Sequence, residues 1–143
     1  MNWKNEAIEH LTRYPAMSHA LNNIPKQIAM LESDAVSLPG VRPDRVGRSN
    51  QSGPRDDALI GNLVKRQELK RSLELAQLWV DATEDALSVL TSEEKLVLER
   101  MYIRPEKGGV GRLCGELGVE QSSVYRKRDH ALYRFAMALY GAA

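Results

Sequence analysis

Apolar residues recur along the first quarter of the chain with alternating spacings of four and three residues, the period of a packed α-helix. The repeat consists of Met17, Leu21, Ile24, Ile28, Leu31, Ala35 and Leu38. A shorter amphipathic helix over residues 3–13 precedes it, and Pro15 interrupts the chain between the two. Pro25 lies inside the repeat, where a proline removes one hydrogen-bond donor and clashes with the preceding turn. We therefore expect the helix to kink or restart at Pro25.

The same spacing returns in a second segment, which starts near residue 57 and continues through residue 90. Its repeat is Leu69, Leu73, Ala76, Val80, Thr83, Leu87 and Leu90, and the face is widened by Leu63, Leu75, Trp79, Ala82 and Ala86. A helix of about 30 residues is about 45 Å long, so one small globular module cannot cover it. The pattern predicts packing on the 17–35 helix, on a partner chain or on both. We expect an antiparallel helical hairpin that sets the oligomeric state.

Residues 37–57 follow neither pattern, because they hold three of the six prolines together with glycine, serine and four arginines. This composition is typical of a flexible linker loop. Its arginines could touch DNA phosphates, although a solvated linker is the plainer interpretation. We therefore divide the chain into N-terminal helices (1–36), a flexible linker (37–57), a long helix (58–90) and a C-terminal domain (91–143).

The C-terminal domain reads as three helices in succession. Thr91 and Glu94 fit a capping box that starts the first helix, and Arg104-Pro105 ends it. A short helix over 110–117 follows, and the last helix covers about 121–140. Since no strand pattern is present anywhere in the sequence, the predicted fold class is all-α.

The last two of these helices carry matching apolar positions on either side of a tight turn. Those of the first are Val110, Leu113, Cys114 and Leu117, and those of the second are Val119, Val124, Ala131, Leu132 and Phe135. Gly118 stands where the first helix must end with a positive φ. This is the helix-turn-helix arrangement, in which the second helix enters the major groove of DNA.

Polar side chains occupy the remaining positions of this second helix. We assign base reading to four residues near its start, namely Gln121, Ser122, Tyr125 and Arg126. Phosphate contacts are assigned to Ser123, Lys127, Arg128 and Arg112. Between Gln121 and Arg134 there are four cations and one anion, a local charge of +3 in a chain whose total is +1. Such clustering favours a polyanionic partner.

Composition limits the class of protein and its cellular compartment, but it indicates no further function. Of the 143 residues, 43% are hydrophobic and 27% charged, which fits an ordinary soluble protein with a modest core. A single cysteine, Cys114, cannot form an internal disulfide, and this favours the cytoplasm. No apolar run approaches about 18 residues, so we expect no membrane span, and the start of the chain lacks the apolar region of a secretory signal.

No set of residues has the spacing of a catalytic or metal site. None of the three histidines, His10, His19 and His130, is spaced with Cys114 or a carboxylate as zinc requires. The glycine-rich stretch 108–111 lacks the following Lys-Ser/Thr of a phosphate loop. We therefore expect no enzymatic activity, no metal and no cofactor.

Two stretches, LTSEEKLVLERMYI and GGVGRLCGELGVEQSSVYRKRDHALYRF, resemble region 4 of bacterial sigma factors. With the preceding heptad helices and the Arg/Pro/Ser loop, the chain resembles phage late-gene transcriptional regulators of the RinA/ArpU type. The resemblance implies a DNA-binding activator of phage or prophage late genes in the bacterial host, with possible contact to RNA polymerase. It also implies recognition positions at Gln121, Ser122, Tyr125 and Arg126. The chain departs from the usual pattern at Glu120, where a Ser or Thr cap is common.

Two other functions remain open at this point. A phage small terminase subunit also uses a helix-turn-helix, in that case for DNA packaging, and forms large rings. A protein-interaction module could bind RNA polymerase through the same domain without any DNA affinity.

Overall fold

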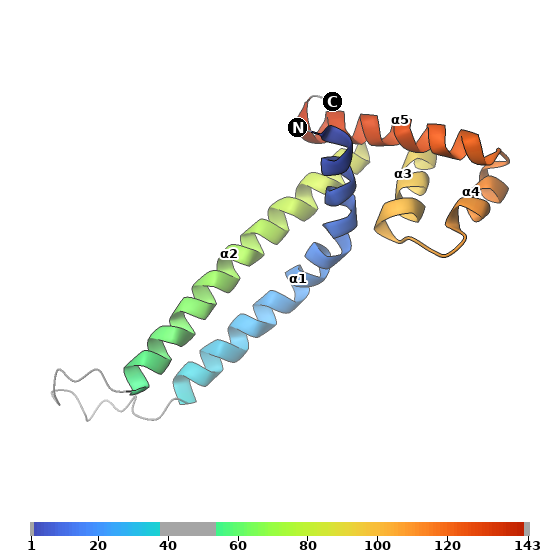
Figure 1. Ribbon diagram of the computed structural model, residues 1–143. Coiled ribbons are helices and arrows are strands. Elements are labelled where there is room, and N and C mark those ends of the chain that lie inside the picture. The colour runs from blue at the N-terminus through green and yellow to red at the C-terminus, as the bar shows by residue number, and fades with distance from the viewer. Residues whose placement is uncertain (1, 38–53, 142–143) are drawn as a thin grey trace. The chain divides into compact units, whose positions relative to one another are not determined.

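The computed structural model describes residues 2–37 and 54–141, and within these ranges it is entirely helical (Figure 1). The elements are α1 (Trp3–Ser37), α2 (Pro54–Ser88), α3 (Ser92–Leu98), the π-helical segment η2 (Glu99–Ile103), α4 (Gly109–Leu117) and α5 (Gln121–Tyr140). The predicted all-α class is therefore confirmed. None of the helices in the described ranges is long and apolar enough to span a membrane.

Helix α1 continues without a break through both prolines, so the predicted interruption at Pro15 is wrong. Of the kink or restart predicted at Pro25, the restart is excluded. An interior proline costs a helix about 3 kcal/mol. Packing on either side offsets this, since Leu11 is fully buried before Pro15 and Ile28 is buried after Pro25. In addition, the Thr12 hydroxyl donates to the Ile8 carbonyl at 2.7 Å in the turn that precedes Pro15.

Helix α2 begins at Pro54, three residues before the expected start. Proline is tolerated in the first helical turn, because the N–H it lacks would have no partner there. Asp56 and Asp57 follow in that turn, where negative charge favours the helix dipole. Ser37, the first residue of the predicted linker, ends α1, and residues 38–53, which include Leu38 of the first apolar repeat, lie outside the described residues.

The chain divides into two compact units. The first unit comprises Met1–Ser18 and Gln77–Ala143, and the second comprises His19–Ala76. Both long helices run through both units, so the first unit is made of two separate stretches of sequence, whereas the second is one continuous stretch.

The larger core of the first unit lies against the second half of α5. It is built from α1, α2, α3 and α5, and its buried members are Ala7, Leu11, Ala86, Leu90, Leu98, Ala131, Leu132, Phe135 and Ala136. The N-terminal segment therefore packs with the C-terminal helix, and Figure 1 shows the start of α1 beside the end of α5.

A polar contact fixes how α1 and α2 pair within the first unit. The ring of His10 stacks on Trp79 at a centroid distance of 4.0 Å, and its Nδ1 lies 2.8 Å from the Thr83 hydroxyl. Trp79 Nε1 donates in turn to the His10 carbonyl at 3.0 Å. Burial lowers the pKa of His10, which favours the neutral ring in this setting.

The second unit has a much smaller interior. Its buried residues are Ile28, Ala76 and Asn62, and the Asn62 amide donates to the Leu31 carbonyl at 2.8 Å. Most members of the two predicted apolar repeats are half-buried here, as expected for one shared contact face. Leu63 and Leu75 differ from the prediction, because they are 46% and 54% exposed and do not widen the buried face.

Replacing Leu11 with alanine tests whether α1 belongs to the core of the first unit. Leu11 is fully buried, so the cavity should lower the free energy of unfolding by about 2–5 kcal/mol. Chemical denaturation followed by circular dichroism would measure this. The matched variant Leu78→Ala removes a side chain that is 68% exposed and should change stability by less than about 0.5 kcal/mol. Equal effects of the two variants would contradict the packing.

Candidate nucleic-acid interface

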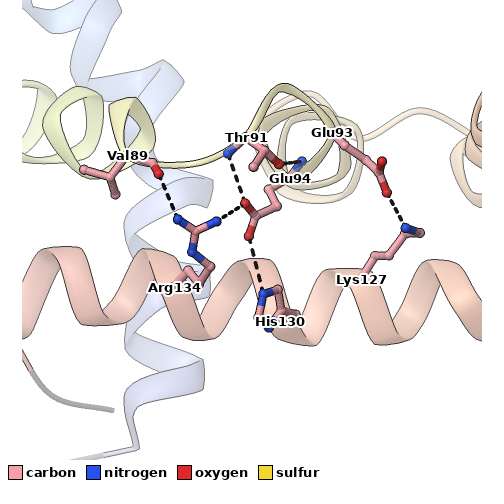
Figure 2. Close-up of polar contacts among 7 residues, drawn as sticks. All are labelled: Val89, Thr91, Glu93, Glu94, Lys127, His130 and Arg134. Carbon is pink, nitrogen blue, oxygen red and sulfur yellow. Dashed lines mark hydrogen bonds and ion pairs between the residues drawn. The ribbon is translucent and has the colours of Figure 1, made fainter.

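The segment that presents α5 begins with the capped start of α3. The Thr91 hydroxyl accepts from the Glu94 N–H at 3.2 Å, and the Glu94 carboxylate accepts from the Thr91 N–H at 3.0 Å. Figure 2 shows both contacts, which complete the capping box that the sequence predicted. The cap fixes the first turn of α3 at the point where the chain leaves α2.

The same carboxylate joins α3 to α5. Glu94 is buried and accepts a hydrogen bond from Arg134, whose other nitrogen donates to the Val89 carbonyl at 3.1 Å (Figure 2). His130 Nε2 lies 4.0 Å from the second carboxylate oxygen. Burial opposes ionisation of Glu94, but the hydrogen bonds from Thr91 and the charge of Arg134 hold its pKa below the ordinary value. The guanidinium of Arg134 therefore binds within the chain and holds α5 to the start of α3.

A second core in the first unit holds α4 against the start of α5. Val97 of α3, Leu113 of α4 and Val124 of α5 are fully buried together. Around them pack the half-buried residues Leu96, Met101, Val110, Cys114, Leu117 and Val119. The inward positions predicted for α4 all belong to this cluster. Val124 is buried on the side of α5 opposite the exposed Ser122 and Arg126, so the cluster sets which residues face outward.

The turn between α4 and α5 depends on Gly118. Its φ of 65° lies in the left-handed region, and its N–H donates to the Cys114 carbonyl. Glu120 follows with extended backbone at the N-cap of α5, where its side chain makes no capping hydrogen bond. Its carbonyl accepts instead from the N–H groups of Ser123 and Val124 at 3.0 and 3.1 Å.

One local feature was not predicted from the sequence. Residues Glu99–Ile103 continue α3 as a π-helix, closed by the Arg104 N–H donating to the Glu99 carbonyl at 2.7 Å. The wider turn places Arg100 within 3.1 Å of Glu116 on α4. This ion pair adds a second link between the end of α3 and α4.

The four residues assigned to base reading all lie in the first two turns of α5. Gln121, Ser122 and Arg126 are exposed, and Tyr125 is half-buried. The Gln121 amide lies 3.3 Å from the Tyr125 hydroxyl, so these two form one local pair. In the described part of the chain, Arg126 forms no ion pair with any neighbour. Its guanidinium is therefore available to an external partner.

The cations assigned to phosphate contacts are paired with carboxylates inside the chain. Lys127 contacts Glu93 of α3, as Figure 2 shows, and Arg112 contacts Glu106. Arg128 pairs with Asp129 at 3.0 Å, and its guanidinium lies 5.0 Å from the Tyr125 ring centroid. Ser123, the fourth residue of this set, is half-buried. The local charge of +3 is thus partly compensated by acids that lie elsewhere in the sequence.

Two exposed residues extend the outward side of α5 beyond the predicted set. His130 and Tyr133 follow Ser122 and Arg126 at helical spacings of three and four residues, and both are exposed. That spacing was visible in the sequence and could have found them. The neighbouring contact from α1 could not be found in this way, because Lys4 donates to Asp129 at 2.9 Å from far away in the chain. This hydrogen bond lowers the pKa of Asp129.

Comparisons with protein-family models, curated proteins and solved structures find no match to this chain. Within the described residues, no group of His, Cys, Asp and Glu side chains is arranged to hold a metal ion. The site is therefore described from the structure alone, as an exposed polar surface on α5, which packs on α3 and α4.

Replacing Gly118 with alanine tests the turn that orients α5. A side chain at φ 65° should cost about 1–2 kcal/mol of unfolding free energy, although no atom lies within 4 Å of the added methyl group. Gly115→Ala is the matched control, because Gly115 is helical and its added methyl group is equally free of contacts. That variant should gain about 0.5–1 kcal/mol. Thermal unfolding that shifts both variants in the same direction would contradict the assigned turn.

Replacing Glu94 with glutamine tests the charge at the α3–α5 junction. Because the folded-state pKa of Glu94 is lowered, its ionisation contributes stability above the unfolded value of 4.5, and this contribution is lost as the pH falls through the folded value. The wild type should therefore lose more stability than Glu94→Gln between about pH 6 and about pH 3. Melting temperatures across this range would measure the difference. Glu93→Gln serves as the exposed control, and an identical pH profile for wild type and Glu94→Gln would refute the role.

Proposed function

We propose that this protein binds double-stranded DNA in a sequence-specific manner and regulates transcription, with α4 and α5 acting as a helix-turn-helix. The observation that carries the proposal is the outward presentation of Ser122 and Arg126 by a helix whose opposite side is fixed by Val124, with the exposed Gln121 at its first position. A recognition helix requires such a polar surface on a rigid support. Arg126 is suited to pair with guanine, and Gln121 with adenine.

The internal ion pairs of the cations are compatible with DNA binding. Lys127–Glu93 and Arg112–Glu106 lie at the surface, where a pair contributes only about 0–1 kcal/mol. A DNA phosphate can therefore replace the carboxylate at little cost in stability. The carboxylates then remain close to the DNA and oppose binding, so they limit non-specific affinity more than they limit base reading.

The resemblance to sigma region 4 and to regulators of the RinA/ArpU type supports a role as an activator of phage or prophage late genes in the bacterial cytoplasm. In this proposal, the helix pair formed by α1 and α2 is a hairpin that joins copies of the chain into a homo-oligomer. RNA polymerase contact would follow occupancy of a site near the promoter. No cofactor and no catalytic step enter the mechanism.

Selection from a random duplex DNA pool, followed by a salt titration on the enriched site, tests the proposal. Arg126→Ala should lose about 1–3 kcal/mol on the preferred site and relax the preference at one base position. Lys127→Ala should weaken binding to all sequences and reduce the salt dependence. An unchanged base preference in Arg126→Ala would rule out its assigned role.

A second function, binding to a protein instead of DNA, is favoured by the pairing of the surface cations with carboxylates of the same chain. Because Lys127, Arg128 and Arg112 are paired with acids, the surface is less positive than the sequence suggests, and this suits a protein partner such as RNA polymerase. Absence of any enriched DNA sequence, together with direct binding to purified polymerase, would favour this function.

A further inference from the structure

The second unit has too little interior to be stable as an isolated pair of helices. Its described residues belong to only two helical segments, and only Ile28, Ala76 and Asn62 among them are buried. Helices gain most of their stability from tertiary packing of an apolar face, and small units usually need association to complete a core. A further layer packed against this unit would supply the interior that its described residues lack.

Helix α2 carries a second row of residues on the side facing away from α1 in this unit. This outer stripe consists of Ile60, Val64, Gln67, Glu68, Arg71 and Leu75, which recur at helical spacing opposite the buried Asn62 and Ala76. Its apolar ends are open to solvent, with Ile60 59% and Val64 44% exposed. Single exposed apolar residues are ordinary, but a row at one helical period indicates a contact surface.

The charges in the middle of the outer stripe identify what covers it. Glu68 and Arg71 are exposed, and neither forms an ion pair within the described part of the chain. In a parallel pair of α2 helices, each charge would face its own copy, and like charges at that distance repel. In an antiparallel pair, a two-fold axis between residues 69 and 70 sets Glu68 against the partner's Arg71. The same axis sets Val64 against the partner's Leu75.

We propose that two copies of this chain associate through the outer stripe, with their α2 helices antiparallel, so that two helix pairs form a four-helix bundle. The charged pair Glu68/Arg71 and the apolar pair Val64/Leu75 are each self-complementary about this axis, as a two-fold interface requires. This identifies the partner and the orientation of the homo-oligomer in the proposed function. It requires neither DNA nor polymerase, so the two proposals are tested separately.

The mass of the full chain in solution, measured by light scattering at about 50 µM, tests the association. Wild type should have twice the chain mass of 16.0 kDa. Val64→Glu should raise the dissociation constant at least about tenfold, because it places charge in the apolar contact. Val36→Glu makes the same change on α1 at a position that is 84% exposed, and it should leave the dimer intact. If Val64→Glu loses helical circular dichroism, Arg71→Glu provides the comparison, with restoration expected in Arg71→Glu/Glu68→Arg.

Cysteine cross-linking tests the orientation in a Cys114→Ala background. Val64→Cys/Leu75→Cys should form a disulfide-linked dimer under oxidation, whereas Val64→Cys alone should not. The two positions are about 16 Å apart on one helix, so they cannot join within a chain.

A dimer that Val64→Glu or Arg71→Glu weakens, and that the double cysteine variant links, establishes the interface. A monomeric wild type, a dimer that none of these changes affects, or cross-linking by Val64→Cys alone overturns it. A ring of about eight or more subunits also overturns it, because a two-fold contact closes at two copies; such a ring would favour the terminase interpretation.

Discussion

The burial of one side of α5 in two separate cores determines how this protein presents its polar surface. Val124 packs with α3 and α4 at the start of the helix, and Phe135 packs with α1 and α2 near its end. A rigid helix held at both ends cannot rotate about its axis. The exposed positions between Gln121 and Arg126 are therefore fixed by contacts that lie far from them in the sequence.

The junction at Glu94 connects these two cores. One carboxylate caps α3, binds Arg134 of α5 and lies near His130, so the start of α3 and the middle of α5 are held together. The buried ionised group is tolerated because hydrogen bonds and an opposite charge replace its water. One arginine of the basic helix, Arg134, thus has a structural contact, whereas Arg126 forms no ion pair in the described part of the chain.

The two units differ in how many residues they bury. The first unit has two apolar clusters that support α5 and its exposed polar surface, and such a supported surface suits recognition of a partner. The second has few buried residues and an apolar stripe with unpaired charges in the described structure, which suits association. In the functions proposed above, the first unit reads a partner and the second sets the number of copies.

The sequence by itself determined the helical class, the capping box at Thr91, the turn at Gly118 and the bounds of α5, because periodicity, caps and turns depend on residues within a few positions of one another. It misjudged the interruption at Pro15, and it left open a restart at Pro25 that does not occur, since local propensity ignores the packing that keeps α1 continuous. Only the tertiary structure decided the ion pairs between residues far apart in the sequence. Lys4 and Asp129 are 125 residues apart, and Arg134 and Glu94 are 40 apart, so no local pattern relates them.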